Sequence, residues 1–203
     1  MKKIMMIAVM AVACLTANAQ TARHSAGSFT LQPMLGLATG SLRGEENTGR
    51  GMVEYENDGI RAGLTVGAEA EYYTRTDWFS LSAGVMYTQQ GWKFDGSDGY
   101  TVKMDYINIP VMTNFYVLRG FALKIGLQPG FLVNAKNGSI DVKDNCNSFN
   151  LSLPVGLSYE FKNGITLDIR GAAAMTNLSK NSNRIKWYSD CGVLTIGYKF
   201  SLK

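Results

Sequence analysis

The sequence is poor in the residues from which most catalytic and metal sites are built. It has one histidine, three cysteines and four prolines in 203 residues, and charged residues make up 18%. The histidine, His24, has no cysteine or carboxylate cluster near it in the sequence, so we expect it to be solvated and expect no metal centre or serine-type triad. No phosphate loop or dinucleotide fingerprint is present either. We therefore expect neither an enzyme nor a cofactor.

Long apolar runs are also scarce. Beyond residue 16 no segment approaches the roughly 20 apolar residues that a membrane-spanning helix needs. The apolar run at residues 4–16 follows a basic start and precedes the small-x-small pattern of residues 17–19, the arrangement of a cleaved export signal. We predict a signal peptide at residues 1–19, cleavage between Ala19 and Gln20, and one domain over residues 20–203. An alternative is a lipobox at residues 11–14, with a lipid on Cys14.

Neither sign of charge dominates. The full sequence has 20 basic and 16 acidic residues, and removal of residues 1–19 takes away Lys2 and Lys3, which leaves a net charge of +2. The sequence pI is about 8.9, but no tract or face rich in lysine and arginine accompanies it. The composition therefore gives no reason to expect a nucleic-acid partner.

Alternation with a period of two is what the sequence has in abundance. Leu123, Ile125 and Leu127 share one face of their segment, while Lys124 and Gln128 share the other. A helix would scatter these apolar side chains around its surface. Eight segments alternate in this way, at residues 29–39, 61–73, 78–91, 104–116, 121–133, 149–161, 165–176 and 192–202.

The connections between these segments alternate in length. Three are short, at residues 74–77, 117–120 and 162–164, and four are long and polar, at residues 41–60, 92–103, 134–148 and 177–191. An up-and-down outer-membrane barrel has this asymmetry, with tight periplasmic turns on one rim and long external loops on the other. We predict an all-β fold in the cell outer membrane, an eight-stranded antiparallel up-and-down transmembrane β-barrel.

The polar face of the strands distinguishes this barrel from a lipocalin, the main soluble alternative. Long charged side chains occur there beside glycines such as Gly67, Gly126 and Gly156. Small residues are expected inside an eight-stranded ring, which is just wide enough for side chains, whereas they would weaken strands on a solvated exterior. We predict that the polar face points inward and that its charges form a closed network that plugs the lumen. The members of this lumen charge network are Glu69, Glu71, Lys124, Glu160, Asp168 and Arg170.

The last strand ends in a pattern typical of the C-termini of outer-membrane barrels. Thr195, Gly197, Phe200 and Leu202 follow the order polar, glycine, apolar, apolar. Such a strand would be an aggregation-prone edge in water unless it closes a ring. We expect it to be the assembly signal that the barrel-assembly machinery reads, with outer-membrane lipid around the closed ring.

Aromatic residues gather toward both ends of the predicted strands. Tyr73, Trp78 and Tyr116 flank short turns, whereas Trp92 and Tyr106 lie toward the opposite rim. Two belts of amphipathic rings suit the two interfaces of a membrane. We therefore expect these rings to face lipid headgroups.

All four prolines fall inside predicted strands, at Pro33, Pro110, Pro129 and Pro154. A closed barrel has no free edge at which a missing amide donor would be harmless. We keep the strands and expect bulges or strand ends at the prolines, which leaves the neighbouring registers open.

Two cysteines remain after export, Cys146 and Cys191, each where a long loop returns to its strand. An even count in an exported protein permits a disulfide between the third and fourth long loops, and the alternative is two free thiols. Second-neighbour strands lie roughly 10 Å apart, beyond the Cα limit of about 7 Å for a disulfide, so the loops would have to lean together.

Three stretches carry more specific motifs. They are residues 85–91 (VMYTQQG), 106–111 (YINIPV) and 127–130 (LQPG), with Tyr-x-Gln-Gln-Gly and Tyr-Ile-x-Ile-Pro the most specific pieces. They resemble the small PorT-like outer-membrane barrels, and the resemblance covers nearly the whole mature chain. It implies an eight-stranded, OmpA/OmpX-like barrel of porin-family type and no particular activity, although one branch of the family assists protein secretion.

Three classes of function remain open. The first is a structural or interaction barrel, whose long loops bind a surface or secretion partner. The second is a narrow, porin-like transporter of small solutes, which conductance would identify. The third is a soluble, lipocalin-like lipid carrier, which membrane fractionation would identify.

Overall fold

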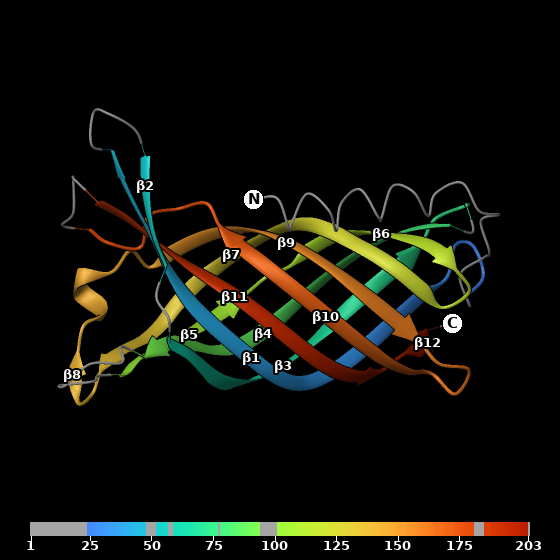
Figure 1. Cartoon of the computed structure of the whole chain (residues 1–203). Coiled ribbons are helices and arrows are strands. Elements are labelled where there is room, and N and C mark those ends of the chain that lie inside the picture. Colours follow the sequence, from blue (N-terminus) through green and yellow to red (C-terminus); the bar gives the residue numbers. More distant parts are fainter. Residues whose placement is uncertain are drawn as a thin grey trace.

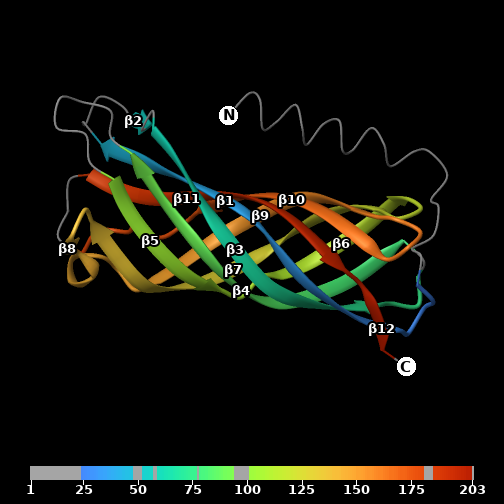
Figure 2. The same ribbon diagram turned by 90° about the horizontal axis from the view of Figure 1, so that it is seen from below.

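The strands form one antiparallel sheet that is rolled into a tilted barrel (Figures 1 and 2). This computed structural model describes residues 24–47, 52–56, 59–76, 78–93, 101–180 and 185–202. In that part of the chain no helix is long and apolar enough to cross a membrane. The elements are β1 (Phe29–Asn47), β2 (Met52–Glu56), β3 (Gly59–Tyr73), β4 (Phe79–Lys93), β5 (Thr101–Asn108), β6 (Val111–Leu118), β7 (Phe121–Asn137), β8 (Ile140–Asp141), η2 (Lys143–Asn145), β9 (Phe149–Glu160), β10 (Ile165–Ala174), β11 (Ile185–Tyr198) and β12 (Phe200–Leu202).

The ring closes between the first and the last strands. β1 pairs with β3 on one side and with β11 and β12 on the other. β5 and β6 occupy one position because both pair with β4 and β7, and β11 and β12 likewise share one position beside β1. The ring over the described residues therefore has eight positions, each antiparallel to its neighbours. This confirms the fold predicted from the alternation and the connection lengths.

The prolines lie at gaps in the ladders, and the register does not change across these gaps. Pro33 lies where the pairing of β1 passes from β12 to β11, and Pro154 lies at a gap between β9 and β7. Pro110 separates β5 from β6, and the preceding residue, Ile109, lies opposite Pro129 in β7. The residue pairs before and after each gap are in the same register. The recorded register shifts lie elsewhere, so no bulge is needed, and each missing donor costs one ladder only.

The two faces of the sheet have opposite chemistry. Ile125, Leu153 and Val155 are 39–47% exposed on the outside, whereas Lys124 and Asp168 are 4% and 1% exposed. The apolar face therefore meets lipid and the polar face lines the interior, as predicted. Small residues make this possible, because a Cβ at Gly126 would overlap the backbone oxygen of Val111.

Several strands continue past the segments that alternate between apolar and polar residues. β1 extends to Asn47 and β11 begins at Ile185, where we predicted loops at residues 41–60 and 177–191. Gly44 and Glu45 pair with both β11 and β2. The predicted loop bounds were wrong because backbone pairing continues beyond the lipid, where an apolar face is no longer required. β2, β8 and η2 all lie at this long-loop end, opposite the C-terminus (Figure 1).

Candidate functional site in the barrel interior and at its rims

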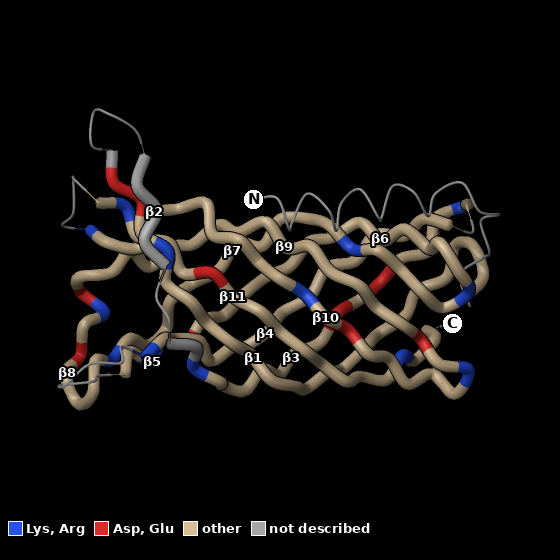
Figure 3. Tube along the Cα trace, in the orientation of Figure 1, with Lys and Arg blue, Asp and Glu red and all other residues tan. Residues whose placement is uncertain are grey.

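Four charged side chains meet halfway along the interior, and we define them as the mid-lumen cluster: Glu69, Lys124, Asp168 and Arg170. Each is at most 4% exposed. Lys124 pairs with Glu69 and lies 3.3 Å from Asp168. Arg170 lies 2.7 Å from Glu69 and 2.5 Å from Asp168. Because β3 is paired with neither β7 nor β10, the contacts of Glu69 with Lys124 and Arg170 cross the lumen, whereas Arg170 and Asp168 lie two residues apart on β10. Side chains of both signs thus lie at the same level of the barrel (Figure 3).

A second polar group, the tight-turn cluster, lies at the end of the interior that carries the short turns. Lys199 Nζ lies 2.6 Å from Glu71 and 3.5 Å from Glu160. Lys199 also donates hydrogen bonds of 3.0 and 3.1 Å to the hydroxyls of Tyr73 and Tyr116. The structure thus divides the six predicted network residues between two clusters. Four form the mid-lumen cluster, and the other two, Glu71 and Glu160, share Lys199.

His24 closes the tight-turn cluster, which corrects the expectation of a solvated tail. Its Nε2 lies 2.9 Å from Glu160 Oε1 and its Nδ1 lies 3.1 Å from Ser201 Oγ. The imidazole also packs on Tyr73, with ring centroids 5.0 Å apart. Gly27 N donates a 2.7 Å hydrogen bond to Tyr73 O. The segment before β1 is therefore fixed against the mouth of the barrel.

Three interior residues that the sequence analysis missed have a recognisable signal in strand parity. Tyr73 shares the face of Glu69 and Glu71, Tyr116 shares that of Asn114, and Lys199 shares that of Thr195. Both tyrosines are at most 3% exposed, so placing them in a lipid-facing aromatic belt was wrong. The position of these tyrosines near a turn suggested an aromatic belt, whereas the alternation along their strands assigns their side chains to the lumen.

The opposite end of the interior is apolar. Trp92 and Tyr106 are 4% and 0% exposed and point inward, which corrects their assignment to the second aromatic belt. They belong to the long-loop-end cluster, whose buried members are Leu42, Trp92, Val102, Met104, Tyr106, Leu132, Ala135, Cys146 and Leu178. Cys146 and Leu178 come from the third and fourth long connections. Loop residues thus pack into the mouth of the barrel at this end.

Both cysteines are free thiols, so the candidate disulfide between Cys146 and Cys191 is not present. Cys191 lies on the lumen face of β11, whereas Cys146 follows η2. The two loops are joined all the same, by an isolated β-bridge between Cys146 and Ser179 and by a 2.7 Å hydrogen bond from Asn147 N to Leu178 O. Burial raises the pKa of the Cys146 thiol, and the Lys180 ammonium acts in the opposite direction.

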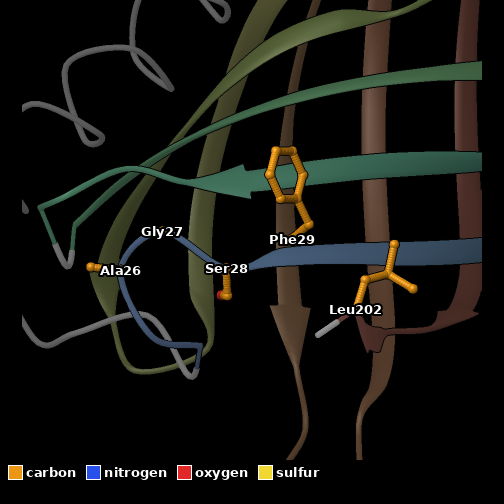
Figure 4. A pocket seen from close by; sticks show the side chains of 5 residues that line it. All are labelled: Ala26, Gly27, Ser28, Phe29 and Leu202. Atoms are coloured by element: carbon orange, nitrogen blue, oxygen red, sulfur yellow. The ribbon is translucent and has the colours of Figure 1, made fainter.

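The residues of the C-terminal pattern lie on both faces of the closing strand. Thr195 is buried in the interior, whereas Phe200 and Leu202 are each 50% exposed on the outside. Leu202 lies opposite Phe29 at the seam of the ring, beside a shallow pocket whose other lining residues are Ala26, Gly27 and Ser28 (Figure 4). The predicted cleavage site, Ala19 and Gln20, lies outside the described residues.

Metal chemistry has little support in the geometry. Among the described residues no three histidine, cysteine, aspartate or glutamate side chains are grouped so as to hold a metal ion. The carboxylates of the interior are instead engaged with lysine and arginine.

An eight-position ring with an apolar exterior, a charged interior and turns of unequal length defines a small outer-membrane β-barrel protein. A family model described as outer membrane protein beta-barrel domain matches residues 18–180. The chain belongs to this family, and its place is the outer membrane. No curated protein matches the sequence.

Solved structures share the fold at low sequence identity. Outer membrane protein AlkL, determined in DMPC lipid bilayers, is 16% identical with a TM-score of 0.51, over 93% of this chain and 96% of AlkL. Neisserial surface protein A is 16% identical with a TM-score of 0.50, over 85% of this chain and 97% of its own. At this identity the likeness shows the fold alone.

Proposed function

We propose that this protein is a non-conducting outer-membrane barrel that holds a surface-interaction platform at its long-loop end. The observation that carries the proposal is the pairing of interior charges across the lumen. Lys124 and Arg170 each contact both Glu69 and Asp168. Buried charges persist when they are paired and hydrogen-bonded, and an eight-stranded lumen leaves little room for water beside them.

The size of one interior cavity supports the same proposal. A cavity of about 10 Å³ lies beside Met86, Arg170 and Cys191. That volume accommodates about one water molecule. The apolar long-loop-end cluster and the tight-turn cluster lie at the two ends of the barrel, so a solute would have to displace three packed layers.

The long-loop end has the stiffness that a binding platform needs. Arg43 in β1 lies 3.1 Å from Asp190 in β11 and contacts Glu45, and its guanidinium lies 4.5 Å from the ring centroid of Tyr188. Arg43 also donates to Ala174 O at 3.1 Å. Together with the bridge between Cys146 and Ser179, these contacts hold the external extensions in place, and loops on a rigid scaffold are common binding sites.

The ends of the chain have roles in export under this proposal. Residues 1–19 are the signal peptide, and residues 20–203 form the mature barrel. Thr195, Gly197, Phe200 and Leu202 form the terminal signal that the barrel-assembly machinery reads. The exposed rings of Tyr198 and Phe200, with centroids 4.7 Å apart, make this strand recognisable before closure.

Planar-bilayer recording tests the proposal. The folded protein should give no channel steps. The quadruple variant Glu69→Ser, Lys124→Ser, Asp168→Ser and Arg170→Ser removes the mid-lumen cluster without changing net charge, and it should also give none, because the tight-turn cluster and the long-loop-end cluster remain packed. Heat-modifiable migration on a gel verifies that each barrel is folded. Regular steps from the unchanged protein would instead support the alternative, a narrow transporter of small solutes.

Deletion of residues 44–58 tests the platform. The pairs between β1 and β3 from Phe29 and Tyr72 to Gly40 and Arg61 are kept in this variant, so the ring should persist. If the loops carry the function, binding of intact cells to surface partners should fall in this variant. Its migration on the gel should stay heat-modifiable. Unchanged binding would exclude this loop as the platform.

A further inference from the structure

The tight-turn end carries an open basin of about 750 Å³. It lies over the turn between β6 and β7, the turn between β9 and β10, and the closing strand. The lining residues used below are His24, Arg119, Glu160, Lys162, Tyr198 and Ser201. The two turns are joined by a 2.7 Å hydrogen bond from Glu160 N to Gly120 O, so the basin has a fixed floor.

The basin has an excess of positive charge. The Glu160 carboxylate is engaged by His24 at 2.9 Å and by Lys199 at 3.5 Å. Arg119 and Lys162 are exposed, and none of the ion pairs recorded among the described residues involves either side chain. Lys199 is shared between Glu160 and Glu71, so at most one negative charge faces the two cations and the basin keeps a net positive charge.

The basin opens to the membrane interface as well as to water. Tyr198 lines it and is 42% exposed on the lipid-facing side of β11. Its ring packs beside Gly164 in the neighbouring turn and against Phe200, 4.7 Å away between centroids. Aromatic rings of this kind lie at headgroup level in a membrane. Figure 3 shows basic residues at both ends of the barrel, including this one.

We propose that this basin binds the phosphodiester headgroup of an anionic glycerophospholipid of the periplasmic leaflet. Arg119 has the planar donor geometry that contacts two phosphate oxygens, and Lys162 supplies a second positive charge. Ser201, whose Oγ lies 3.1 Å from His24 Nδ1, borders the same space. The proposal places the headgroup at the seam side of the ring and does not depend on whether the lumen conducts.

Lipid retention tests the site. The folded barrel is taken from vesicles of phosphatidylcholine with one tenth phosphatidylglycerol, and the phosphatidylglycerol that stays bound is counted by native mass spectrometry. We expect Arg119→Gln to lower retention about fivefold, and Arg119→Gln with Lys162→Gln to abolish the preference over phosphatidylcholine. Heat-modifiable migration verifies folding of each variant.

Arg75→Gln is the matched control. Arg75 is also an exposed arginine at the tight-turn end, in the turn between β3 and β4, and it does not line the basin. Its replacement should change retention less than twofold. Equal losses from Arg75→Gln and Arg119→Gln would overturn the proposal in favour of a diffuse surface potential.

Inorganic phosphate separates a lipid site from a general anion site. Phosphate added at 20 mM should leave phosphatidylglycerol retention unchanged, because the glycerolipid is also held by the surrounding apolar surface. Binding of inorganic phosphate with no preference for phosphatidylglycerol would overturn the assignment to lipid.

Discussion

Lys124 shows how a single side chain can govern the stability of the interior. It is the one lysine of the mid-lumen cluster and contacts both carboxylates there. If it is removed, Glu69 and Asp168 share only Arg170, which leaves a buried excess of one negative charge. Breaking a buried pair by removing one partner is strongly destabilising, because the remaining charge has lost its compensation.

Lys124→Met should therefore lower the free energy of unfolding by about 3–5 kcal/mol. Urea unfolding in lipid vesicles, followed by tryptophan fluorescence, measures the effect. Lys136→Met is the control on the same strand, since Lys136 is exposed, and it should change stability by less than about 0.5 kcal/mol. Equal midpoints for the two variants would contradict the ion-pair argument.

Gly126 makes a second prediction at this scale. Alanine there would place its Cβ against the backbone oxygen of Val111, so Gly126→Ala should fold more slowly and unfold at lower urea. At Gly171 an added Cβ meets nothing within 4 Å, and Gly171→Ala should be tolerated. The two variants are compared by the fraction of refolded protein that runs as the folded, heat-modifiable band in unheated samples. Tolerance of both would mean that the strands can separate locally.

The identity of the interior residues could be predicted from parity, whereas their partners could not. Alternation places Glu69 and Lys124 on the same side of the sheet. Their contact depends on the width of the closed ring and on β3 lying across from β7, which no local pattern contains. His24 lies outside any strand, so no alternation of apolar and polar residues could predict its contact with Glu160.

At the scale of elements, the third and fourth long connections are paired and packed, although their polar, glycine-rich composition predicts irregular loops. The third and fourth are joined through Cys146 and Ser179, and their apolar residues enter the mouth of the barrel. Polar, glycine-rich stretches carry no alternation from which such pairing can be read. A disulfide would have required the two loops to lean together, and in the structure backbone hydrogen bonds bring them together without one.

Thiol labelling tests this arrangement. Cys146 is 8% exposed with a raised pKa, and Cys191 faces the interior, so neither should react with a polyethylene-glycol maleimide in the folded barrel at pH 7. The thiolate is the reactive form, and burial disfavours it. After unfolding without reductant, both should react and add two labels by mass. Labelling only after reduction would mean that the two cysteines are bonded in the isolated protein.

For the whole molecule, the membrane explains why the fold is readable from sequence. Lipid requires an apolar exterior on every strand, so alternation continues for about ten residues in each of eight segments. Beyond the lipid that requirement ends, and the sequence no longer marks where β1 stops or β11 begins. The edge of the lipid-facing band therefore also separates the strand segments that the sequence predicts from the extensions that it does not.

The orientation of the barrel follows from the same asymmetry and can be measured in cells. With Cys146 and Cys191 replaced by serine, Ser139→Cys places a thiol in the exposed turn before β8, and Asn163→Cys places one in the turn before β10. A membrane-impermeant maleimide should label Ser139→Cys on intact cells, because long loops face outward. Asn163→Cys should react only after the outer membrane is permeabilised. The reverse pattern would place the lipid-binding basin at the cell surface and exclude a ligand from the periplasmic leaflet.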